Sequence, residues 1–465
     1  MVAFFSFSSA VIDTWNANRF YKQSRQLGQL LRGDFSSIAA ELARVFPHTT
    51  GLQERFVPLV SRYAHELSGL YTRPVVRRFN APGEPSGLVK LQAVYAASQV
   101  DRVLHQAHRS LLVQNTVVLL VLPAGVGRVK LEVFEPWQVD WVVGDPLRAD
   151  DVQAAQVVNL RVPIKIEGDA VIYGNLVVSQ TEIYIDKGGA KVPVYGDSTR
   201  NPFGFLPLIV LRGEVPAPGR PFASVNEPLL NMNLALCVSE SDTELLVHTQ
   251  AWGQKVIENA QIAQQVEELQ VGPDKVLALV SNDPQAQPPR LVVVQGQPPL
   301  AQITGWNESR LRLLCSMFDL SPDAFLKVNT AVTASARAYD ARDRQEAKAR
   351  YEPIFVQAEQ ELANVVGAVL NLSEPVKVPV PVSVQLDYPA WDPPVDPLHE
   401  AQALASNVAL GVESAVAVVA ARAGVSRAAA RVMVENNLKE RAELTALGMT
   451  MQPMAGAPAG GEAMP

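Results

Sequence analysis

One long segment without glycine constrains the fold of this chain more than any other feature. Glu227–Gln250 contains no glycine, and its only proline, Pro228, falls where a first helical turn tolerates it. The segment therefore predicts one helix of about 24 residues, or roughly 36 Å at about 1.5 Å per residue. No Lys or Arg occurs between Arg220 and Lys255, so we expect this helix to carry a net negative charge.

A compact insert follows this helix, and a second helix then returns. The runs KVLALVS (275–281) and RLVVVQG (290–296) are typical of short strands, and IAQQVEELQ before them could form a short helix. After Pro298–Pro299, helical composition resumes over about Leu300–Asp319. The order of helix, small insert and helix predicts a stalk with a tip.

Along the sequence, the segments that precede this helix pair predict helices first and strands afterwards. The first 115 residues predict mainly helices and the apolar period changes to that of strands from Thr116 onward, so we expect an α+β fold. The candidate helices are Ser9–Arg32, Asp34–Phe46, Leu52–Leu70 and Leu88–Asn115. The candidate strands are 117–123, 129–134 and 139–143, followed by further apolar runs that end at Leu211.

Another long helix is predicted after a stretch of low charge. Residues 324–336, AFLKVNTAVTASA, hold one charge, Lys327, and Arg337 then begins a helix that reaches about Leu372. Pro353 is expected to kink this helix, because its ring removes a backbone hydrogen bond and crowds a preceding carbonyl. Apolar residues at helical spacing predict one packing face, formed by Tyr351, Ile354, Phe355, Ala358, Leu362, Val365, Val366 and Val369.

The C-terminal part is rich in proline and then in alanine. One strand, VPVSVQLDY (380–388), is expected among the prolines. Three helices are expected over about Pro397–Ala409, Glu413–Ala423 and Arg427–Leu447, the last with Ser426 as its N-cap. The tail 448–465 is expected to be disordered.

Size, charge and cysteine content exclude several classes of protein. At 465 residues, the chain is too long for one ordinary core, so two or more packed regions are expected. A net charge of −7 without a clustered basic face disfavours tight, static DNA binding, although a channel through which DNA slides remains compatible. Cys237 and Cys315 are expected to be small buried hydrophobic residues rather than disulfide partners. The start lacks a basic region and no run of eighteen apolar residues occurs, so we expect a soluble protein with neither a signal peptide nor a membrane span.

The sequence offers no residues for a catalytic, cofactor or metal site. The motifs GxxxxGK[ST], HExxH and GxSxG do not occur, so neither an ATP-driven motor nor a common hydrolase is predicted. His105 and His108 could share a metal on one helix face, but we expect them to be surface histidines. Asp145, Asp150 and Asp151 are expected to form a solvated turn. We therefore expect no enzyme and no cofactor.

Several segments, in this order, resemble bacteriophage portal proteins, the head-to-tail connectors of tailed double-stranded DNA phages. The resemblance covers about residues 52–445 and rests on element order rather than on a strict motif. One departure is that alanines stand in the MFDLSPDAFLKVNTAVTASARA segment where relatives often carry glycine beside serine. The segments are VSRYAHELSGLYTRPVVRRF, SLLVQNTVVLLVLP, EVFEPWQVDWVVGDP, NPFGFLPLIVL, NEPLLNMNLALCVSESDTELLVHTQAW, MFDLSPDAFLKVNTAVTASARA and PPVDPLHEAQALASNVALGVESAVAVVAARAGVS.

The resemblance implies a subunit with named regions that assembles into a ring of about a dozen copies. The regions would be an N-terminal wing part (1–225), a first stem helix (226–251), a clip (252–299), a second stem helix (300–320), a tunnel loop (321–337), a tunnel helix with a wing return strand (338–396), a crown (397–447) and a tail (448–465).

The implied function is a channel for DNA packaging into, and ejection from, a viral head. Double-stranded DNA would pass through the ring without sequence specificity, and the subunit would be a virion component at the portal vertex, assembled in the host cytoplasm. The partners implied are the terminase large subunit, an adaptor or head-completion protein, and the major capsid and scaffold proteins, with no membrane involved.

The implied DNA contacts come from two regions. A tunnel loop with few cations could form an apolar collar that holds DNA weakly, and an acidic stem helix would keep DNA from sticking. Alternatively, the stem carboxylates face neighbouring subunits or solvent, and the loop is a buried linker. The tunnel-loop candidates are Phe325, Leu326, Lys327, Val328, Asn329, Thr330 and Val332, and the stem candidates are Glu240, Asp242 and Glu244.

Two other classes of function remain open. The chain could be another ring-forming phage structural protein, such as an adaptor or tail component, although an insert between two long helices argues against this class. It could also be an enzyme with a non-standard site, which would predict a ligand-filled cleft and a small defined oligomer. End-on particle images of the purified protein would separate the three classes.

Overall fold

The computed structural model divides into two compact units. One is built from the chain up to Ala331 together with Tyr339–Trp391, and the other from Val332–Ala338 and the chain from Asp392 onward. The structure describes residues 18–45, 54–82, 85–125, 127–143, 145–167, 170–195, 197–251, 254–258, 260–262, 279–281, 290–294, 300–318, 334–373, 376–389, 397–423 and 425–446.

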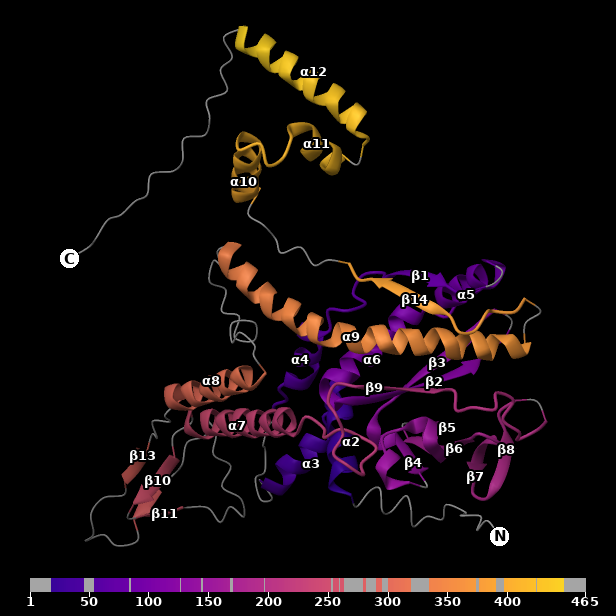
Figure 1. The fold of residues 1–465 in the computed structure, drawn as a ribbon. Coiled ribbons are helices and arrows are strands. Elements are labelled where there is room, and N and C mark those ends of the chain that lie inside the picture. Colours follow the sequence, from indigo (N-terminus) through magenta and orange to yellow (C-terminus); the bar gives the residue numbers. More distant parts are fainter. Residues whose placement is uncertain are drawn as a thin grey trace. The chain divides into compact units, whose positions relative to one another are not determined.

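Helices dominate the N-terminal part of the first unit, as predicted (Figure 1). The side chain of Asn18 accepts a hydrogen bond from the backbone N–H of Phe20 and so caps the first described helix. The apolar sides of the first three of these helices share one core with the end of the fifth helix and with residues of later helices, whereas the fourth helix packs in a different core. The helices are α2 (Arg19–Leu31), α3 (Ser36–Val45), α4 (Leu59–Leu67), α5 (Pro85–Ala97) and α6 (Val100–Gln114).

The single helix predicted over Leu88–Asn115 is wrong, because the chain breaks between α5 and α6. Gln99 adopts a left-handed conformation with φ of 51° and precedes the first turn of α6. The hydroxyl of Ser98 accepts a hydrogen bond from the backbone N–H of Val129. This tertiary contact replaces helix continuity at a place where neither glycine nor proline marks a break.

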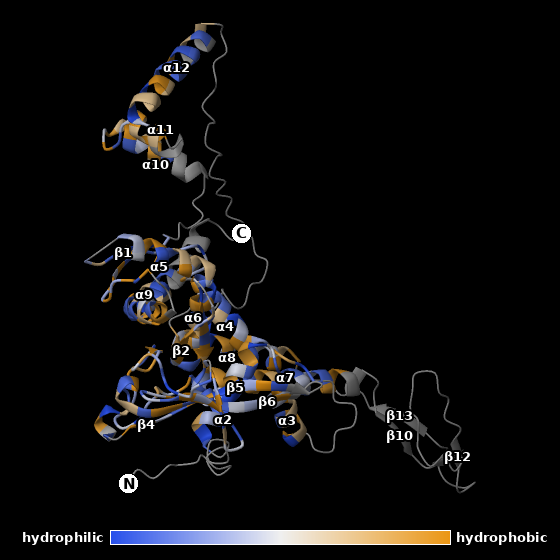
Figure 2. Ribbon diagram, turned by 90° about the vertical axis from the view of Figure 1, so that its right-hand side faces the viewer, coloured by the Kyte–Doolittle hydropathy of each residue, from blue (hydrophilic) through white to orange (hydrophobic). Residues whose placement is uncertain are grey.

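Strand β2 (Thr116–Pro123) lies at the centre of a three-stranded antiparallel sheet between β3 (Val129–Phe134) and β9 (Leu208–Arg212). Successive side chains of a strand point to opposite faces, and both faces of β2 are covered. Val117, Leu119 and Val121 enter one core, whereas Val118, Leu120 and Leu122 enter another. The continuous apolar run therefore reflects burial on both faces, and hydrophobic residues gather on α6 and β2 in Figure 2.

A five-stranded antiparallel sheet completes the strand-rich region, in the order β4-β5-β6-β7-β8. Gly188 and Gly189 both have positive φ, which gives the two-residue turn between β7 and β8. The strands are β4 (Val139–Val143), β5 (Ala155–Glu167), β6 (Ala170–Ser179), β7 (Ile183–Lys187) and β8 (Ala190–Pro193). The α+β fold class is thus confirmed.

Helix α9 (Ala334–Ser373) packs on the core that β2, α5 and α6 share. Of the predicted stripe, the five residues Phe355, Ala358, Leu362, Val366 and Val369 are buried, and the other three are partly buried against the same core. The helix runs unbroken through Pro353, and Figure 1 draws it as bent. Strand β14 (Ser383–Asp387) pairs antiparallel with β1 (Val76–Asn80), so the chain after α9 returns to the N-terminal half.

In the described part of the second unit, the helices after residue 396 have bounds that agree closely with the prediction. They are α10 (Pro397–Ala409), α11 (Ala415–Ala423) and α12 (Arg427–Ala446). The hydroxyl of Ser426 accepts a hydrogen bond from the backbone N–H of Ala429 at 3.3 Å, which confirms the predicted N-cap. Among the helices that the structure describes, none is long and apolar enough to cross a bilayer.

Candidate functional site on helices α7 and α8

Helices α7 (Glu227–Ala251) and α8 (Leu300–Met317) form the long pair that the sequence predicts, and they lie side by side in Figure 1. Their apolar residues share a core with α2, α3 and α4. Cys237 and Cys315 are both free and buried in it, as predicted. Burial raises the pKa of the Cys237 thiol, so this cysteine is a packing residue rather than a nucleophile.

A buried asparagine joins the two helices. Asn307 on α8 is almost fully buried; its side-chain carbonyl accepts a hydrogen bond from the Ser239 hydroxyl at 3.0 Å. Its amide donates to the Glu240 carboxylate, also at 3.0 Å. Because a buried amide without partners would be costly, these bonds fix the register of α8 against α7.

The three stem carboxylates do not share one side of α7. Residues 240 and 244 are four apart and lie on one side, whereas residue 242, two positions from each, lies on the other. Glu240 is held by Asn307, and Glu244 forms an ion pair with Arg55 at 2.8 Å. Asp242 is exposed. Among these three carboxylates, Asp242 forms no hydrogen bond or ion pair with the described residues. Which of them face a channel stays a prediction.

Helix α8 presents a second face whose large apolar side chains are exposed in the described part of the chain. Trp306, Leu313 and Met317 are 59%, 57% and 53% exposed, and together with Arg310 they follow helical spacing along one side. The Arg310 guanidinium lies 3.8 Å from the centre of the Trp306 ring. A cation stacked on a tryptophan within a row of large exposed apolar residues is typical of a protein contact surface.

Two short antiparallel ladders lie in the insert between these helices. Strand β10 (Gln254–Glu258) pairs with β13 (Arg290–Val294), and β11 (Ala260–Ile262) pairs with β12 (Leu279–Ser281). The strands predicted over 275–281 and 290–296 overlap β12 and β13, whereas β10 and β11 were not predicted. The short helix expected at IAQQVEELQ has only its first residue, Ile262, among the described residues, and that residue belongs to strand β11.

The tunnel-loop candidates lie outside the described residues, so their contact with DNA stays a prediction. These candidates are Phe325, Leu326, Lys327, Val328, Asn329, Thr330 and Val332.

The first unit also contains a buried ionic cluster that the sequence analysis missed. Arg77 on β1 binds Glu359 on α9 through two nitrogens, at 2.6 and 2.8 Å, and contacts Asp101 on α6 at 2.6 Å. The Tyr71 hydroxyl donates a third hydrogen bond to Glu359 and lies 3.1 Å from the Tyr388 hydroxyl. Burial raises the pKa of Glu359, and Arg77 opposes that shift. This cluster connects β1, α6 and α9, and we interpret its role as structural.

The prediction that His105 and His108 are surface residues is wrong for His108. Its side chain is fully buried, with its ring centre 5.4 Å from that of Tyr351 and 5.2 Å from that of Phe355. His105 is half-buried. In the described part of the chain, no group of three or more His, Cys, Asp or Glu side chains could hold a metal ion.

The acidic turn is solvated, as predicted. Asp145 accepts a hydrogen bond from the backbone of Leu147, and Asp151 caps the short helix η3 (Val152–Ala154) and pairs with Arg148. All these contacts lie at exposed side chains.

Comparisons with known proteins give a distant likeness among solved structures. No family model matches the chain, and no curated protein matches it. Among solved structures, the chain is similar to one described as "Neck of empty GTA particle computed with C6 symmetry". The two share 12% sequence identity, the match covers 79% of this chain and 89% of that chain, and the TM-score is 0.39. A TM-score this low assigns neither a fold nor a function.

Proposed function

We propose that the chain is a portal subunit, one of about a dozen copies in a ring through which DNA enters and leaves a viral head. The terminase large subunit would dock on the insert between α7 and α8 during packaging, and an adaptor or head-completion protein would dock there afterwards. The strand-rich region would meet capsid and scaffold proteins. The role is structural rather than catalytic.

The observation that carries this proposal is the exposed face of α8. Closed rotational symmetry requires heterologous contacts, in which one face of a subunit meets a different face of the next. The row of Trp306, Arg310, Leu313 and Met317 offers one such face. The exposed Asp242 on α7 offers a complementary charge for Arg310 of the next copy. The resemblance in element order supports the same arrangement.

The acidic character of α7 supports a sliding role for DNA. Each phosphate neutralised by Lys or Arg releases counterions and adds affinity, and a ring multiplies every contact. A helix without cations between Arg220 and Lys255 avoids such contacts along its whole length. DNA would therefore pass without being held.

Electron-microscope images of the purified protein test the proposal. We expect end-on rings with a central hole and a mass of about 0.6 MDa, or about a dozen copies of a 50.4 kDa chain. A stable monomer or dimer at micromolar concentration, with no rings even inside assembled heads, would refute it. Rings without a projecting insert would instead favour an adaptor or tail component.

A further inference from the structure

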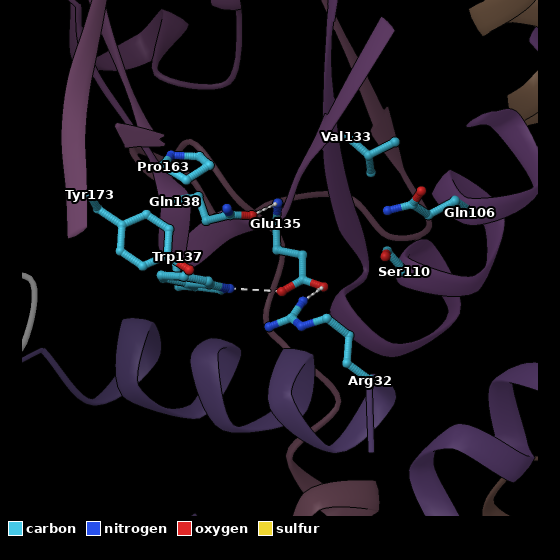
Figure 3. A pocket seen from close by; sticks show the side chains of 9 residues that line it. All are labelled: Arg32, Gln106, Ser110, Val133, Glu135, Trp137, Gln138, Pro163 and Tyr173. Atoms are coloured by element: carbon cyan, nitrogen blue, oxygen red, sulfur yellow. Dashed lines mark hydrogen bonds and ion pairs between the residues drawn. The ribbon is translucent and has the colours of Figure 1, made fainter. Parts of the chain in front are cut away.

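The first unit buries its apolar residues within the chain. Its described apolar side chains form three cores, two of which meet at strand β2. The charged residues that line its polar pocket of about 260 Å³, Arg32 and Glu135, pair with each other at 3.0 Å (Figure 3). The Trp137 indole donates to the same carboxylate at 2.7 Å. This unit therefore has its cores and its charge pairing within one copy.

Helices α10, α11 and α12 of the second unit bury almost nothing. Among the side chains that the structure describes between residues 397 and 446, only Ala430 is buried. Large apolar side chains are exposed instead, with Leu410 at 78% and Val412 at 72%. The described part of these helices therefore lacks a hydrophobic core of its own. The other exposed large apolar residues are Val408, Val432, Met433 and Leu438.

Local hydrogen bonds define the ends of these helices. Gly411, with φ of 71°, follows the end of α10, and the Ser414 hydroxyl accepts from the backbone N–H of Ala417 at 3.1 Å at the start of α11. The exposed ion pair of Arg431 and Glu435, at 3.3 Å, lies within α12. Such contacts set where a helix begins and ends. Helices of 9 to 20 residues are nevertheless marginal in water without tertiary packing.

A stretch this short has few other ways of becoming stable. Below about 70 residues, a domain usually needs a disulfide, a structural metal or oligomerisation in addition to its core. Residues 397–446 contain no cysteine and a single histidine, His399, so their sequence offers neither a disulfide nor the usual ligands of a structural zinc. Oligomerisation is the remaining source of the missing burial.

The charge of this stretch favours a second copy of the chain as the partner. Residues 397–446 contain five Lys or Arg and five Asp or Glu, so their formal net charge is zero with histidine neutral. A DNA-binding surface carries a clustered excess of positive charge, and a strongly charged protein partner would require an opposite excess. A neutral surface with exposed apolar side chains instead favours self-association.

The exposed apolar residues lie on two different elements, as a heterologous contact between copies requires. Val408, Leu410 and Val412 form one patch, at the end of α10 and in the turn that follows it. Val432 belongs to α12, two positions after the buried Ala430 and therefore on the opposite side of that helix. One copy thus offers two unlike apolar surfaces.

We propose that the patch formed by Val408, Leu410 and Val412 packs on the Val432 side of α12 in the next copy of the chain. This contact rests on the proposed function, because rotational symmetry brings the same two surfaces together at every subunit boundary of a ring. It is separate from the row on α8. It also makes the stability of α10, α11 and α12 depend on assembly, since a partner that binds the folded form stabilises it.

Cysteine cross-linking in the full chain tests the contact. The double variant Leu410→Cys/Val432→Cys, treated with a short bismaleimide, should give a ladder of covalent multimers on a denaturing gel. Leu410→Cys alone should remain a single-chain band, because a heterologous contact does not bring like positions together. The control is Leu410→Cys/Asn437→Cys, whose second site is exposed on another side of α12. The native Cys237 and Cys315 are buried.

Hydrogen exchange of the full-length variant Val432→Glu gives a second measurement that needs no introduced cysteine. Because the row on α8 still holds the ring, we expect this variant to assemble. The amides of α12 should then exchange about tenfold faster or more than in wild-type rings, because the helix loses packing against its neighbour. Asn437→Glu adds the same charge on another side of α12 and should leave their exchange unchanged.

The outcomes separate this contact from the proposed function. Rings that give no ladder, or whose α12 exchange is unchanged by Val432→Glu, overturn the contact and leave the proposed function standing. A ladder in a protein that forms no rings keeps the contact between copies and refutes the proposed function. Protection of α12 that appears only after capsid or scaffold proteins are added identifies those proteins as the partner and overturns the proposal. Failure of Val432→Glu to assemble, where Asn437→Glu does assemble, supports it.

Discussion

At the scale of single residues, the pair formed by Arg77 and Glu359 is a buried, two-pronged ion pair. The two side chains are 9% and 0% exposed and lie 282 residues apart in the sequence. Together they connect β1 to α9. Removing one partner of such a pair leaves a buried charge without compensation, which costs more than the pair itself contributes.

Replacing Arg77 with methionine is therefore expected to lower the free energy of unfolding by about 3–5 kcal/mol. Adding Glu359→Gln to that variant removes the stranded charge and should recover much of the loss. Urea denaturation of the two single variants and the double variant measures the coupling. A double variant no more stable than Arg77→Met would show that burial of the charge is not what the single change costs.

His108 gives a second prediction, about pH. Burial lowers its pKa to about 3, with a smaller contribution from His105, whereas the pKa of an exposed histidine is about 6.5. The folded state therefore keeps this histidine neutral while the unfolded state binds a proton below about pH 6.5. Stability is complete above that pH and falls as the pH decreases toward 3, with about 2 kcal/mol lost by about pH 5.

The matched variant is His108→Phe, since the ring packs between Tyr351 and Phe355. We expect it to flatten the decline in unfolding free energy between about pH 6.5 and pH 4. Denaturant unfolding at a series of pH values makes the comparison. Equal slopes in the wild type and the variant would mean that His108 becomes protonated in the folded protein.

Sequence reasoning missed these residues for an identifiable reason. Glu359 lies four residues after Phe355 and three before Leu362, so it interrupts the buried stripe of α9, and a charge on a packing face is a sign of a buried partner. The partner, Arg77, could not be named, because nothing local marks contacts across such a separation. For His108, the spacing from His105 shows a shared helix but not which side of α6 meets α9.

At the scale of elements, prediction succeeded where length and periodicity were strong. The glycine-free segment became α7, and the doubly buried run became β2. Prediction failed where a tertiary contact ends a helix, as Ser98 does between α5 and α6. It also failed for very short strands, such as β8 and β11. The same holds for the candidate site. The two stem helices were predicted from the sequence, whereas the register set by Asn307 and the exposed row on α8 are seen only in the folded structure.

That row leads to a prediction about assembly. Leu313→Glu places a charge in the exposed row without disturbing the core, since the side chain is 57% exposed. The variant should keep wild-type helical content but fail to form rings, because a desolvated carboxylate opposes the contact. Light scattering after size-exclusion chromatography measures the mass.

Ala301→Glu is the control for the assembly prediction. It adds the same charge to another exposed side of α8 and should leave ring formation unchanged. If Leu313→Glu assembles as well as Ala301→Glu does, the row on α8 is not a subunit contact.

At the scale of the whole molecule, charge distribution and assembly have to be considered together. The chain carries a net charge of −7, and a ring of about a dozen copies would multiply every feature of its channel by that number. A single added cation per subunit is then a ring of cations around DNA. This multiplication makes the low charge of residues 324–336 the most sensitive sequence feature for a translocating channel.

Replacing both Val328 and Val332 with lysine adds about two dozen positive charges around a full ring. Each new phosphate contact strengthens holding and steepens the dependence of DNA affinity on salt. We expect the double variant to assemble, to package DNA more slowly than the wild type, and to recover partly as salt rises. Packaging rates of wild-type and variant heads across a salt series measure this, with Val328→Gln/Val332→Gln as a control for polarity without charge. Equal rates at every salt concentration would place the segment away from DNA. Failure to form rings in both variants would indicate a buried linker, because neither lysine nor glutamine can be solvated in a core.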